Sequence, residues 1–244
     1  MAPTLDKDSV LVLASNNQGK LVEMQKRLEG SGVTVLTLKD LDLPQADETG
    51  DSTAENASLK STGAAEGFDF SAVEAKVGRP VSKVIVAAED TGLEIPSLGG
   101  WPGPHYALLT EKTPGGERDD EMGNAKVLAK LADQPGADRK AVFTSTLAVT
   151  EVRRDGMDAK PTLYTAEMVG RIAEKPRGDN GFGFDAILEV DGPRGRPVTF
   201  AQLDRSQKAE YSPRPKAVDK MVQAIYPKSE VVADGPAKRP GQTG

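Results

Sequence analysis

The sequence predicts an α/β protein with a mixed β-sheet, and three observations support this. Residues 10–30 have the pattern of a strand, a polar turn and a helix. A second strand pattern and a second helix pattern follow before residue 67. Residues 141–152 and 163–172 then show period-two stretches with β-branched residues, which are typical of strands. Strands that alternate with helices and are followed by long strands indicate a mixed sheet flanked by helices.

The first third of the chain supplies the alternating part of this pattern. Residues 10–14 are a continuous apolar run, typical of a strand covered on both faces. The polar turn 15–20 precedes apolar residues at helical spacing, so a helix is predicted over 21–30. Residues 33–36 predict a second strand, and residues 53–66 predict a second helix.

Further elements follow at residues 84–88, 119–131 and 216–225. The first is another buried strand, which we expect to end directly at Glu89. The other two have helical patterns, the last of them amphipathic. Residues 70–82 carry little pattern, so we expect an insertion or a long loop there.

The pattern organises the chain as one domain over residues 10–230. Residues 1–9 form a short N-terminal extension. Residues 231–244 are rich in Pro, Gly, Lys and Ala with little to bury, so we expect a disordered tail.

Composition excludes several classes of chemistry. There is no cysteine, which excludes disulfides, zinc–thiolate sites and thiol nucleophiles. His105 is the single histidine, so multi-histidine metal sites are excluded. The formal charge is −6, from 31 basic and 37 acidic residues, and no basic run suits a nucleic acid lattice. The remaining candidates for catalysis and binding are carboxylates, Lys, Arg, hydroxyls, backbone N–H groups and a hard metal ion.

The sequence contains neither a signal-peptide pattern nor an apolar stretch of membrane-spanning length. We therefore expect a soluble, cytoplasmic protein without a membrane partner.

Two polar clusters in the first sixty residues are candidate sites. The turn 15–20 lies where backbone N–H groups and a helix dipole collect an anion, and Lys20 adds a charge. A helix cap with a solvated lysine would give the same sequence. Glu55, Asn56 and Lys60 lie within about one and a half helical turns. An exposed face with an intrahelical ion pair remains the alternative interpretation.

Glu89 and Asp90 follow a buried strand, and paired carboxylates at the carboxyl end of a strand suit a magnesium ion. A simple turn is the alternative there. In the segment 181–185, Gly-Phe-Gly-Phe-Asp, an exposed aromatic ring would stack on a nucleobase and the carboxylate would accept from its N–H edge. A core phenylalanine beside a bend is the alternative.

Five motifs in order give the sequence a family resemblance. From about residue 10 to residue 225 the chain resembles the inosine/xanthosine triphosphate pyrophosphatase family, whose members cleave non-standard purine nucleoside triphosphates to the monophosphate and pyrophosphate. The motifs are Ala14-Ser-Asn-Asn-Gln-Gly-Lys20; Glu48-Thr-Gly50 with Glu55-Asn-Ala57 and Lys60; Glu89-Asp-Thr-Gly-Leu93 with Leu98-Gly-Gly-x-Pro-Gly103; Gly181-Phe-Gly-Phe-Asp185; and Lys208 with Ser212-x-Arg214.

The resemblance implies a two-lobed fold around a long twisted mixed sheet, an active-site cleft between the lobes, a homodimer, a purine nucleoside triphosphate substrate and Mg²⁺. It implies catalytic roles for Asp90, Lys20 and Lys60, with Asp90 activating water. It assigns Glu48, Glu89 and Asp90 to the metal. Of the substrate contacts, it assigns Ser15, Asn17, Lys20 and Lys60 to the phosphates and Phe182, Asp185, Lys208, Ser212 and Arg214 to the base, with Thr91 as a further contact.

The chain departs from the family pattern at Pro213, where the family has a histidine between Ser212 and Arg214. Proline has neither an N–H nor a side-chain donor, so a contact that helps recognise a 6-oxo purine is missing. Two alternatives therefore stand beside the leading hypothesis. One is the same reaction with a base preference shifted toward adenine nucleotides or analogues, and the other is a nucleotide-binding protein without turnover.

Overall fold

The computed structural model describes residues 3–6, 8–15, 18–66, 68–113, 115–192 and 195–226. Within these residues, nine strands form one mixed sheet in the order β2-β1-β3-β5-β7-β8-β9, with β4 beside β3 and β6 beside β5. The strands are β1 Ser9–Leu13, β2 Thr34–Thr37, β3 Lys83–Glu94, β4 Pro102–Gly103, β5 Lys140–Arg153, β6 Gly156–Met157, β7 Thr162–Ile172, β8 Leu188–Asp191 and β9 Pro197–Thr199.

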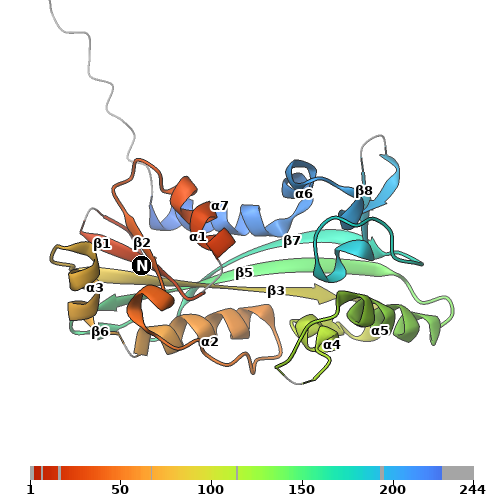
Figure 1. Cartoon of the computed structure of the whole chain (residues 1–244), viewed down its shortest axis with the longest axis horizontal. Helices are drawn as coiled ribbons and strands as arrows, with labels where there is room; N and C mark the ends of the chain where they lie inside the picture. Colours follow the sequence, from red (N-terminus) through yellow and green to blue (C-terminus); the bar gives the residue numbers. More distant parts are fainter. Residues whose placement is uncertain are drawn as a thin grey trace, which may run out of the picture.

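Helices cover the sheet at both of its ends (Figure 1). The α-helices are α1 Gln18–Arg27, α2 Thr53–Glu66, α3 Phe70–Val77, α4 Tyr106–Thr110, α5 Asp120–Ala132, α6 Arg205–Tyr211 and α7 Pro213–Ile225. Short 3₁₀ helices lie at η1 Lys39–Leu41, η2 Pro96–Leu98, η3 Gly183–Ala186 and η5 Phe200–Gln202.

The long strands β3, β5 and β7 connect two lobes (Figure 1). The first lobe contains β1 and β2, which are parallel to each other and to β3, together with α1, α2, α3 and α7. The second lobe contains α4, α5, α6, β8 and β9. Because β5 is antiparallel to both β3 and β7, the sheet is mixed. The predicted two-lobed α/β fold is confirmed.

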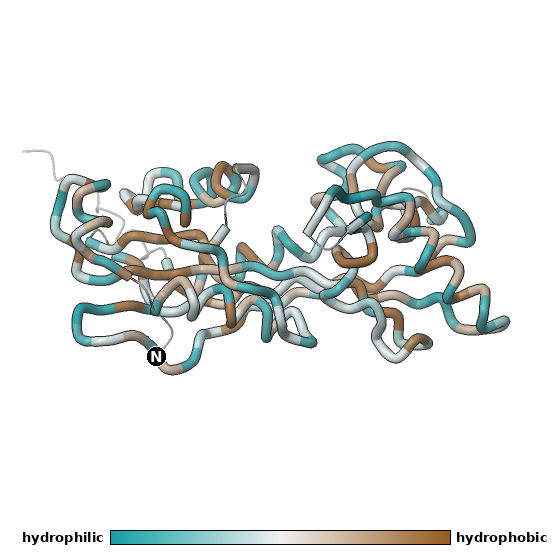
Figure 2. The backbone as a smooth tube through the Cα atoms, turned by 60° about the horizontal axis from the view of Figure 1, so that its bottom comes forward, coloured by the Kyte–Doolittle hydropathy of each residue, from teal (hydrophilic) through white to brown (hydrophobic). Residues whose placement is uncertain are grey.

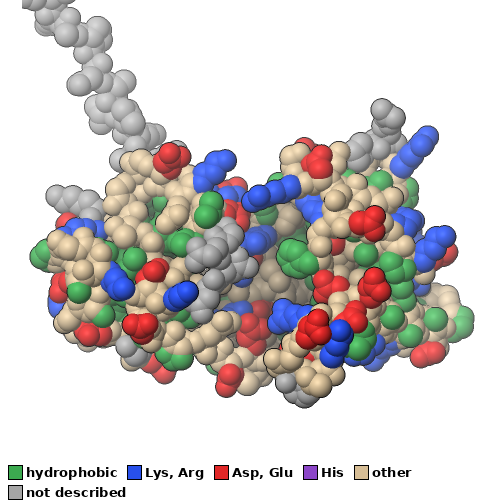
Figure 3. Space-filling model, in the orientation of Figure 1, with side chains coloured by type: hydrophobic (Ala, Val, Ile, Leu, Met, Phe, Trp, Pro, Cys, Tyr) green, Lys and Arg blue, Asp and Glu red, His purple; other side chains and the backbone are tan. Residues whose placement is uncertain are grey.

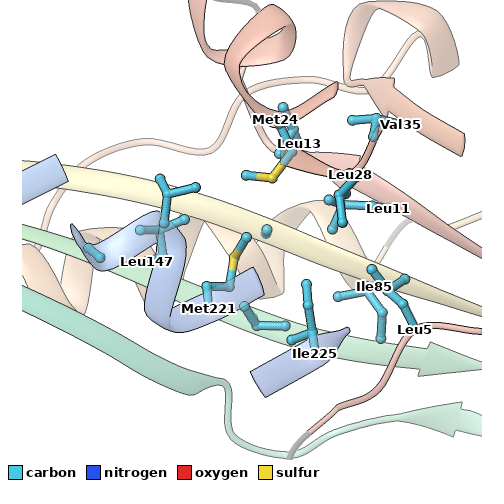
Figure 4. Packing of buried hydrophobic residues seen from close by; sticks show 14 of the residues in the cluster. Leu5, Leu11, Leu13, Met24, Leu28, Val35, Ile85, Leu147, Met221 and Ile225 are labelled. Carbon is cyan, nitrogen blue, oxygen red and sulfur yellow. The ribbon is translucent and has the colours of Figure 1, made fainter. Parts of the chain in front are cut away.

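The first lobe buries both faces of its sheet. On one face Ile85 packs with residues of α1 and α7, among them Met24 and Met221 (Figure 4). On the other face Val84 and Val86 pack against α2 and α3. Burial on both faces explains why the run 84–88 is apolar throughout rather than alternating. The second lobe has its own apolar cluster, and the strands between the lobes are more polar (Figure 2).

Three sequence predictions need correction. The strand predicted over 84–88 continues to Glu94, because β5 pairs with β3 along that whole length. The loop predicted over 70–82 contains α3, which Asp69 caps by accepting a hydrogen bond from the N–H of Ser71 at 2.8 Å. The last helix begins at Pro213, three residues before the predicted start.

The N-terminal segment packs on the first lobe. Leu5 is buried in its core, and its N–H donates to the carbonyl oxygen of Ile225. The predicted tail, residues 231–244, lies outside the described residues. None of the described helices combines the length and the apolar composition needed to cross a membrane.

Candidate active site

Three consecutive polar residues lie at the centre of β3, between the two lobes. Successive side chains of a strand point to opposite faces, so Glu89 and Asp90 project from opposite faces of the sheet. Glu89 faces α1 and α7, and Asp90 faces α2. Thr91 is exposed. The expectation that both carboxylates cluster at the end of a strand is therefore wrong, because β3 does not end there.

Lys60 brings Asp90 and Glu48 together on the α2 face. Its Nζ lies 2.8 Å from Oδ1 of Asp90 and 3.1 Å from Oε1 of Glu48. The side chains of Lys60 and Asp90 are buried, whereas that of Glu48 is 43% exposed. One ammonium thus bridges two carboxylates that come from a loop and from the middle of a strand.

The environment of Asp90 favours proton uptake. Burial raises the pKa of Asp90 above its ordinary value, Lys60 opposes that rise, and Glu48 adds to it. Oδ2 of Asp90 is buried, and among the described residues it has no hydrogen-bond partner. An acceptor in this state is ready for a proton, a water or a metal ion.

The start of α2 fixes the loop that carries Glu48. Oε2 of Glu55 accepts from the N–H of Asp51 at 2.8 Å, and Oδ1 of Asn56 accepts from the N–H of Gly50 at 2.7 Å. A Cβ at Gly50 would lie 2.6 Å from Cβ of Glu55, so only glycine allows this close approach. Glu55 and Asn56 therefore hold backbone, and Lys60 alone of the predicted trio reaches the carboxylates.

On the opposite face, Glu89 holds two cations. Its Oε2 lies 3.0 Å from Nζ of Lys20 and 3.0 Å from Nε of Arg214, and its Oε1 accepts from the hydroxyl of Ser145 at 3.0 Å. Burial raises the pKa of Glu89, but the two cations and the hydrogen bonds outweigh it, so the net shift is downward. Ser15 lines a small cavity of about 20 Å³ beside this group.

In the second lobe, the two phenylalanines of the segment 181–185 have different environments. Phe184 packs edge-on against Tyr106 and Phe143, with ring centroids 5.1 and 5.0 Å away. Phe182 is 82% exposed. Phe184 therefore fits the alternative of a packed phenylalanine beside a bend, whereas stacking on a base stays a prediction for the exposed Phe182.

Asp185 and Lys208 form an ion pair beside Phe182. Nζ of Lys208 lies 2.6 Å from Oδ2 of Asp185 and donates to the carbonyl oxygen of Asn180 at 3.0 Å. Burial raises the pKa of Asp185, and Lys208 opposes that rise. Gly181 has φ +95°, and a Cβ there would lie 2.1 Å from Oδ2 of Asp185 and 2.2 Å from Nζ of Lys208, so the ion pair requires glycine.

Two residues of α5, which the sequence analysis missed, hold the backbone next to Phe182. Oδ2 of Asp120 accepts from the N–H of Gly183 at 2.6 Å, and Nδ2 of Asn124 donates to its carbonyl oxygen at 3.1 Å. Asn124 is itself buried and accepts from the hydroxyl of Tyr106 at 2.8 Å. No spacing in the sequence links these residues to residue 183, because the contact is made only by packing.

The segment from Ser212 to Arg214 begins α7. Ser212 caps the helix, with its Oγ 3.4 Å from the N–H of Arg214. Pro213 occupies the first helical turn, where a missing N–H costs nothing, and its side chain is buried. Arg214 is ion-paired with Glu89 and, at 3.4 Å, with Glu23. The structure thus places Arg214 with Lys20, whereas the ion-pair partner of Lys208 is Asp185.

The predicted metal set is divided between the two faces of the sheet. Glu48 and Asp90 are together, but Glu89 is paired with Lys20 and Arg214 instead, because alternation along β3 turns it away. No group of three or more His, Cys, Asp or Glu residues suited to a metal ion occurs among the described residues. Asn17, a predicted phosphate contact, lies outside them.

A hollow separates the two lobes on the face shown in Figure 3, and charged side chains of both signs surround it. Lys20, Lys60 and Arg214, the cations paired with Glu89 and Asp90, are carried by helices of the first lobe, whereas Phe182, Asp185 and Lys208 belong to the second lobe. The arrangement therefore places cations and carboxylates on one side and an exposed aromatic ring on the other, which suits a ligand with an anionic chain and a flat base.

Comparisons with known proteins agree with this geometry. The family model described as the Ham1 family matches residues 11–224. The dITP/XTP pyrophosphatase of Mycolicibacterium paratuberculosis is 35% identical over 221 residues, which is 89% of this chain and 96% of that protein. The dITP/XTP pyrophosphatase of Symbiobacterium thermophilum is 35% identical over 215 residues, covering 88% and 94%. The solved structure of a HAM1 protein from Coxiella burnetii aligns with a TM-score of 0.71 at 31% identity, covering 87% of this chain and 95% of that one.

Proposed function

This chain belongs to the Ham1 family, and on that premise we propose that it is a nucleoside triphosphate pyrophosphatase that hydrolyses dITP, ITP and XTP to the monophosphate and pyrophosphate. The observation that carries this function is the buried Asp90 carboxylate, which Lys60 holds through Oδ1 while the hydrogen-bonding capacity of Oδ2 is unused among the described residues. A group in that state can take a proton from a water molecule.

The reaction forms one bond to the α-phosphorus, breaks another, and transfers one proton from water. A water oxygen attacks the α-phosphorus, the bond from that phosphorus to the bridging oxygen of the β-phosphate breaks, and pyrophosphate leaves. The proton of the attacking water goes to Oδ2 of Asp90, whose raised pKa matches this role. Lys60 keeps the carboxylate oriented and adds positive charge near the phosphates.

The donor set at Asp90 fits a divalent metal ion, and we propose Mg²⁺. Magnesium is usually held by one or two carboxylates together with substrate phosphates and waters. Glu48 and Asp90 supply two carboxylates, and Oδ2 of Asp90 has the capacity for a ligand. When bound, the ion would neutralise developing charge on the triphosphate. Glu89 is left out of this set because it faces the other side of β3.

The remaining predicted contacts divide into a phosphate side and a base side. Ser15 follows β1 and Lys20 lies in the first turn of α1, where backbone N–H groups and the helix dipole favour an anion, and we assign Ser15, Asn17 and Lys20 to the phosphates. Thr91 follows Asp90 on β3, and Ser212 is the N-cap residue of α7. Phe182 would stack on the purine, with Asp185 and Lys208 at its edge.

A second candidate function is the same hydrolysis with a shifted base preference. Pro213 is buried and cannot donate a hydrogen bond, so a recognition contact for a 6-oxo purine is absent at that position. Loss of such a contact would relax selectivity by about 1–3 kcal/mol.

A triphosphate panel tests both functions. Inosine, deoxyinosine, xanthosine, adenosine and guanosine triphosphates are incubated with the protein and Mg²⁺, and pyrophosphate and orthophosphate are measured separately. Pyrophosphate from the 6-oxo purines supports the leading function, and comparable rates with adenosine triphosphate support the second. Orthophosphate as the main product would contradict the proposed bond cleavage, and tight binding without turnover would indicate a nucleotide-binding protein. Chelation should abolish activity and Mg²⁺ should restore it.

We also propose that the catalytic domain spans residues 10–230 and works as a homodimer in the cytoplasm, where nucleoside triphosphates are made and used. Leu163 and Val169 on β7 are 45% and 61% exposed, and such apolar side chains are available to an interface. Light scattering of the purified chain tests the dimer.

A further inference from the structure

Glu89 has a set of partners that the reaction at Asp90 does not use. Its carboxylate is 6% exposed and contacts Lys20 of α1, Arg214 of α7 and Ser145 of β5. The elements that carry these residues are far apart in the sequence, and Glu89 joins them from the centre of the sheet. A buried carboxylate with two cations and a hydroxyl is fully satisfied, so its ionised form is stable there.

The carboxylate keeps two like charges close together. Nζ of Lys20 and Nε of Arg214 each lie 3.0 Å from the same oxygen, Oε2, so they are no more than 6.0 Å apart. Two cations at that separation repel each other unless a negative charge lies between them. Removing the charge of Glu89 would therefore let the two side chains move apart.

The cations lie on the accessible side of this group. The side chains of Lys20 and Arg214 are 26% and 29% exposed, whereas Glu89 is buried beneath them. Ser15, at the end of β1, lines the same small cavity as all three side chains. This cavity of about 20 Å³ has room for about one water molecule. A pair of partly exposed cations over a buried carboxylate presents positive charge toward an anionic ligand.

We propose that Glu89 is a positioning residue that holds Lys20 and Arg214 as a pair of cations for the phosphate chain of the substrate. The proposal rests on the proposed function, in which Lys20 contacts the triphosphate. It places Arg214 on the phosphate chain rather than on the base, and it gives Glu89 no contact with the metal ion.

The direction in which Glu89→Gln changes the affinity for an anion distinguishes a positioning role from simple charge balance. Glu89→Gln removes a negative charge next to the cation pair, and by charge alone this would tighten the binding of an anion. If Glu89 instead fixes the geometry of the pair, the same substitution weakens binding, because the two cations no longer meet the phosphates together.

The experiment uses the full chain and two readouts. Binding of inorganic tripolyphosphate is measured by calorimetry without metal, and steady-state kinetics are measured with deoxyinosine and adenosine triphosphates and Mg²⁺. For Glu89→Gln we expect tripolyphosphate affinity and kcat/KM each to fall about tenfold or more. The fall in kcat/KM should be the same for both bases, and the Mg²⁺ concentration for half-maximal activity should not change.

Two further variants test whether the loss in Glu89→Gln arises through Lys20 and Arg214. Arg214→Met should also lower kcat/KM by the same factor for both bases, because it removes a phosphate contact. In a Lys20→Met background, Glu89→Gln should have a clearly smaller effect than in the wild type, since one of its two targets is gone. Full additivity of the two substitutions would contradict the proposal.

The matched control is Glu151→Gln. Glu151 lies on β5, is 8% exposed and pairs with Arg153 at 2.6 Å, so it is another buried carboxylate of the same sheet with its own cation. This variant should leave both readouts unchanged. Thermal unfolding of each variant shows whether it is folded, and Glu89→Asp, which keeps the charge but is one methylene shorter, repeats the test if Glu89→Gln unfolds. Glu89→Asp should lower both readouts in the same direction.

Besides full additivity, three outcomes overturn the proposal: tighter binding of tripolyphosphate by Glu89→Gln, a higher Mg²⁺ requirement in that variant, or a loss of kcat/KM that depends on the base. If the wild type binds tripolyphosphate but cleaves no nucleoside triphosphate, the proposed function fails. The effect of Glu89→Gln on tripolyphosphate affinity then still decides the role of Glu89 in positioning the two cations.

Discussion

Nζ of Lys60 lies 2.8 Å from Oδ1 of Asp90, and both side chains are buried between α2 and the centre of the sheet. This ion pair has two consequences. It keeps a carboxylate oriented at the proposed reaction centre, and it makes the stability of the first lobe depend on a charge that the chemistry uses.

Lys60→Met should lower stability in the absence of metal. The substitution leaves the buried Asp90 without its cation, and breaking a buried pair costs about 3 kcal/mol. Added Mg²⁺ should recover part of that loss if Asp90 and Glu48 bind the ion. Urea denaturation with and without Mg²⁺ measures both effects. Lys112→Met, which removes an exposed lysine paired with Glu117, should change stability by less than about 0.5 kcal/mol in either condition.

In Lys60→Met, the acidic limb of the plot of kcat/KM against pH should move to higher pH. Burial raises the pKa of Asp90 and Lys60 lowers it, so removing Lys60 raises it further. Because Asp90 must be deprotonated to accept a proton from water, kcat/KM should rise with pH through a higher midpoint in Lys60→Met than in the wild type. Profiles of kcat/KM at fixed Mg²⁺ test this. A limb that stays in place, or that moves to lower pH, would argue against Asp90 as the base.

Phe182→Ala should weaken substrate binding without destabilising the fold. The ring is 82% exposed, so it contributes little to the core, whereas stacking on a base is worth about 1–3 kcal/mol. We expect KM to rise about 5- to 150-fold, with thermal stability unchanged. The control is Phe184→Ala, which removes the ring that packs on Tyr106 and Phe143 and should cost about 3 kcal/mol of stability.

Asn124→Ala should raise KM through its effect on Phe182. The substitution removes the donor to the carbonyl oxygen of Gly183 and the acceptor for Tyr106, and it should cost about 1–3 kcal/mol of stability. If Asn124 acts by holding the backbone next to Phe182, its effect on KM should nearly vanish in a Phe182→Ala background. Equal effects in the two backgrounds would show that Asn124 acts elsewhere.

The ion pair of Asp185 gives a prediction for stability against pH. Burial raises the folded-state pKa of Asp185 above its ordinary 3.8, so the folded protein binds this proton more tightly than the unfolded chain does. The contribution of Asp185 to the free energy of unfolding is therefore largest below pH 3.8 and declines as the pH rises through the folded-state pKa. Relative to Asp185→Asn, the wild type should lose stability as the pH rises through that window. The exposed Asp179→Asn should follow the wild type in the same denaturation series.

The sequence predicted the main strands because their apolar residues are consecutive or alternate along the chain. It did not predict how far β3 extends, because charged residues at 89 and 90 are typical of a strand end. They remain inside the strand because Lys20, Lys60 and Arg214, remote in sequence, neutralise them. The helix α3 was missed because it buries a single residue, Val73, which gives little apolar pattern. Asp69 and Gly78 nevertheless mark its two ends.

The candidate site was predictable as a set of residues but not as a geometry. The motif order picked out Glu48, Lys60 and Asp90, which the structure brings together. It did not separate Glu89 from them, since the face on which a side chain lies depends on where the strand continues. Nor did it distinguish Phe182 from Phe184, because only packing in the second lobe decides which ring lies against Tyr106 and which is exposed.

The neighbouring carboxylates of β3 also limit which sequence changes the chain can tolerate. Deletion of one residue between Val84 and Glu89 would move Asp90 into the place of Glu89, beside Lys20 and Arg214, and would leave Thr91 opposite Lys60; an insertion would instead turn Asp90 away from Lys60 and put Glu89 in its place. β3 is paired with β1 on one side and β5 on the other, so no loop is at hand to absorb the shift. Over this stretch the spacing of residues is therefore as restricted as their identity, and changes in length belong in the loops between the strands.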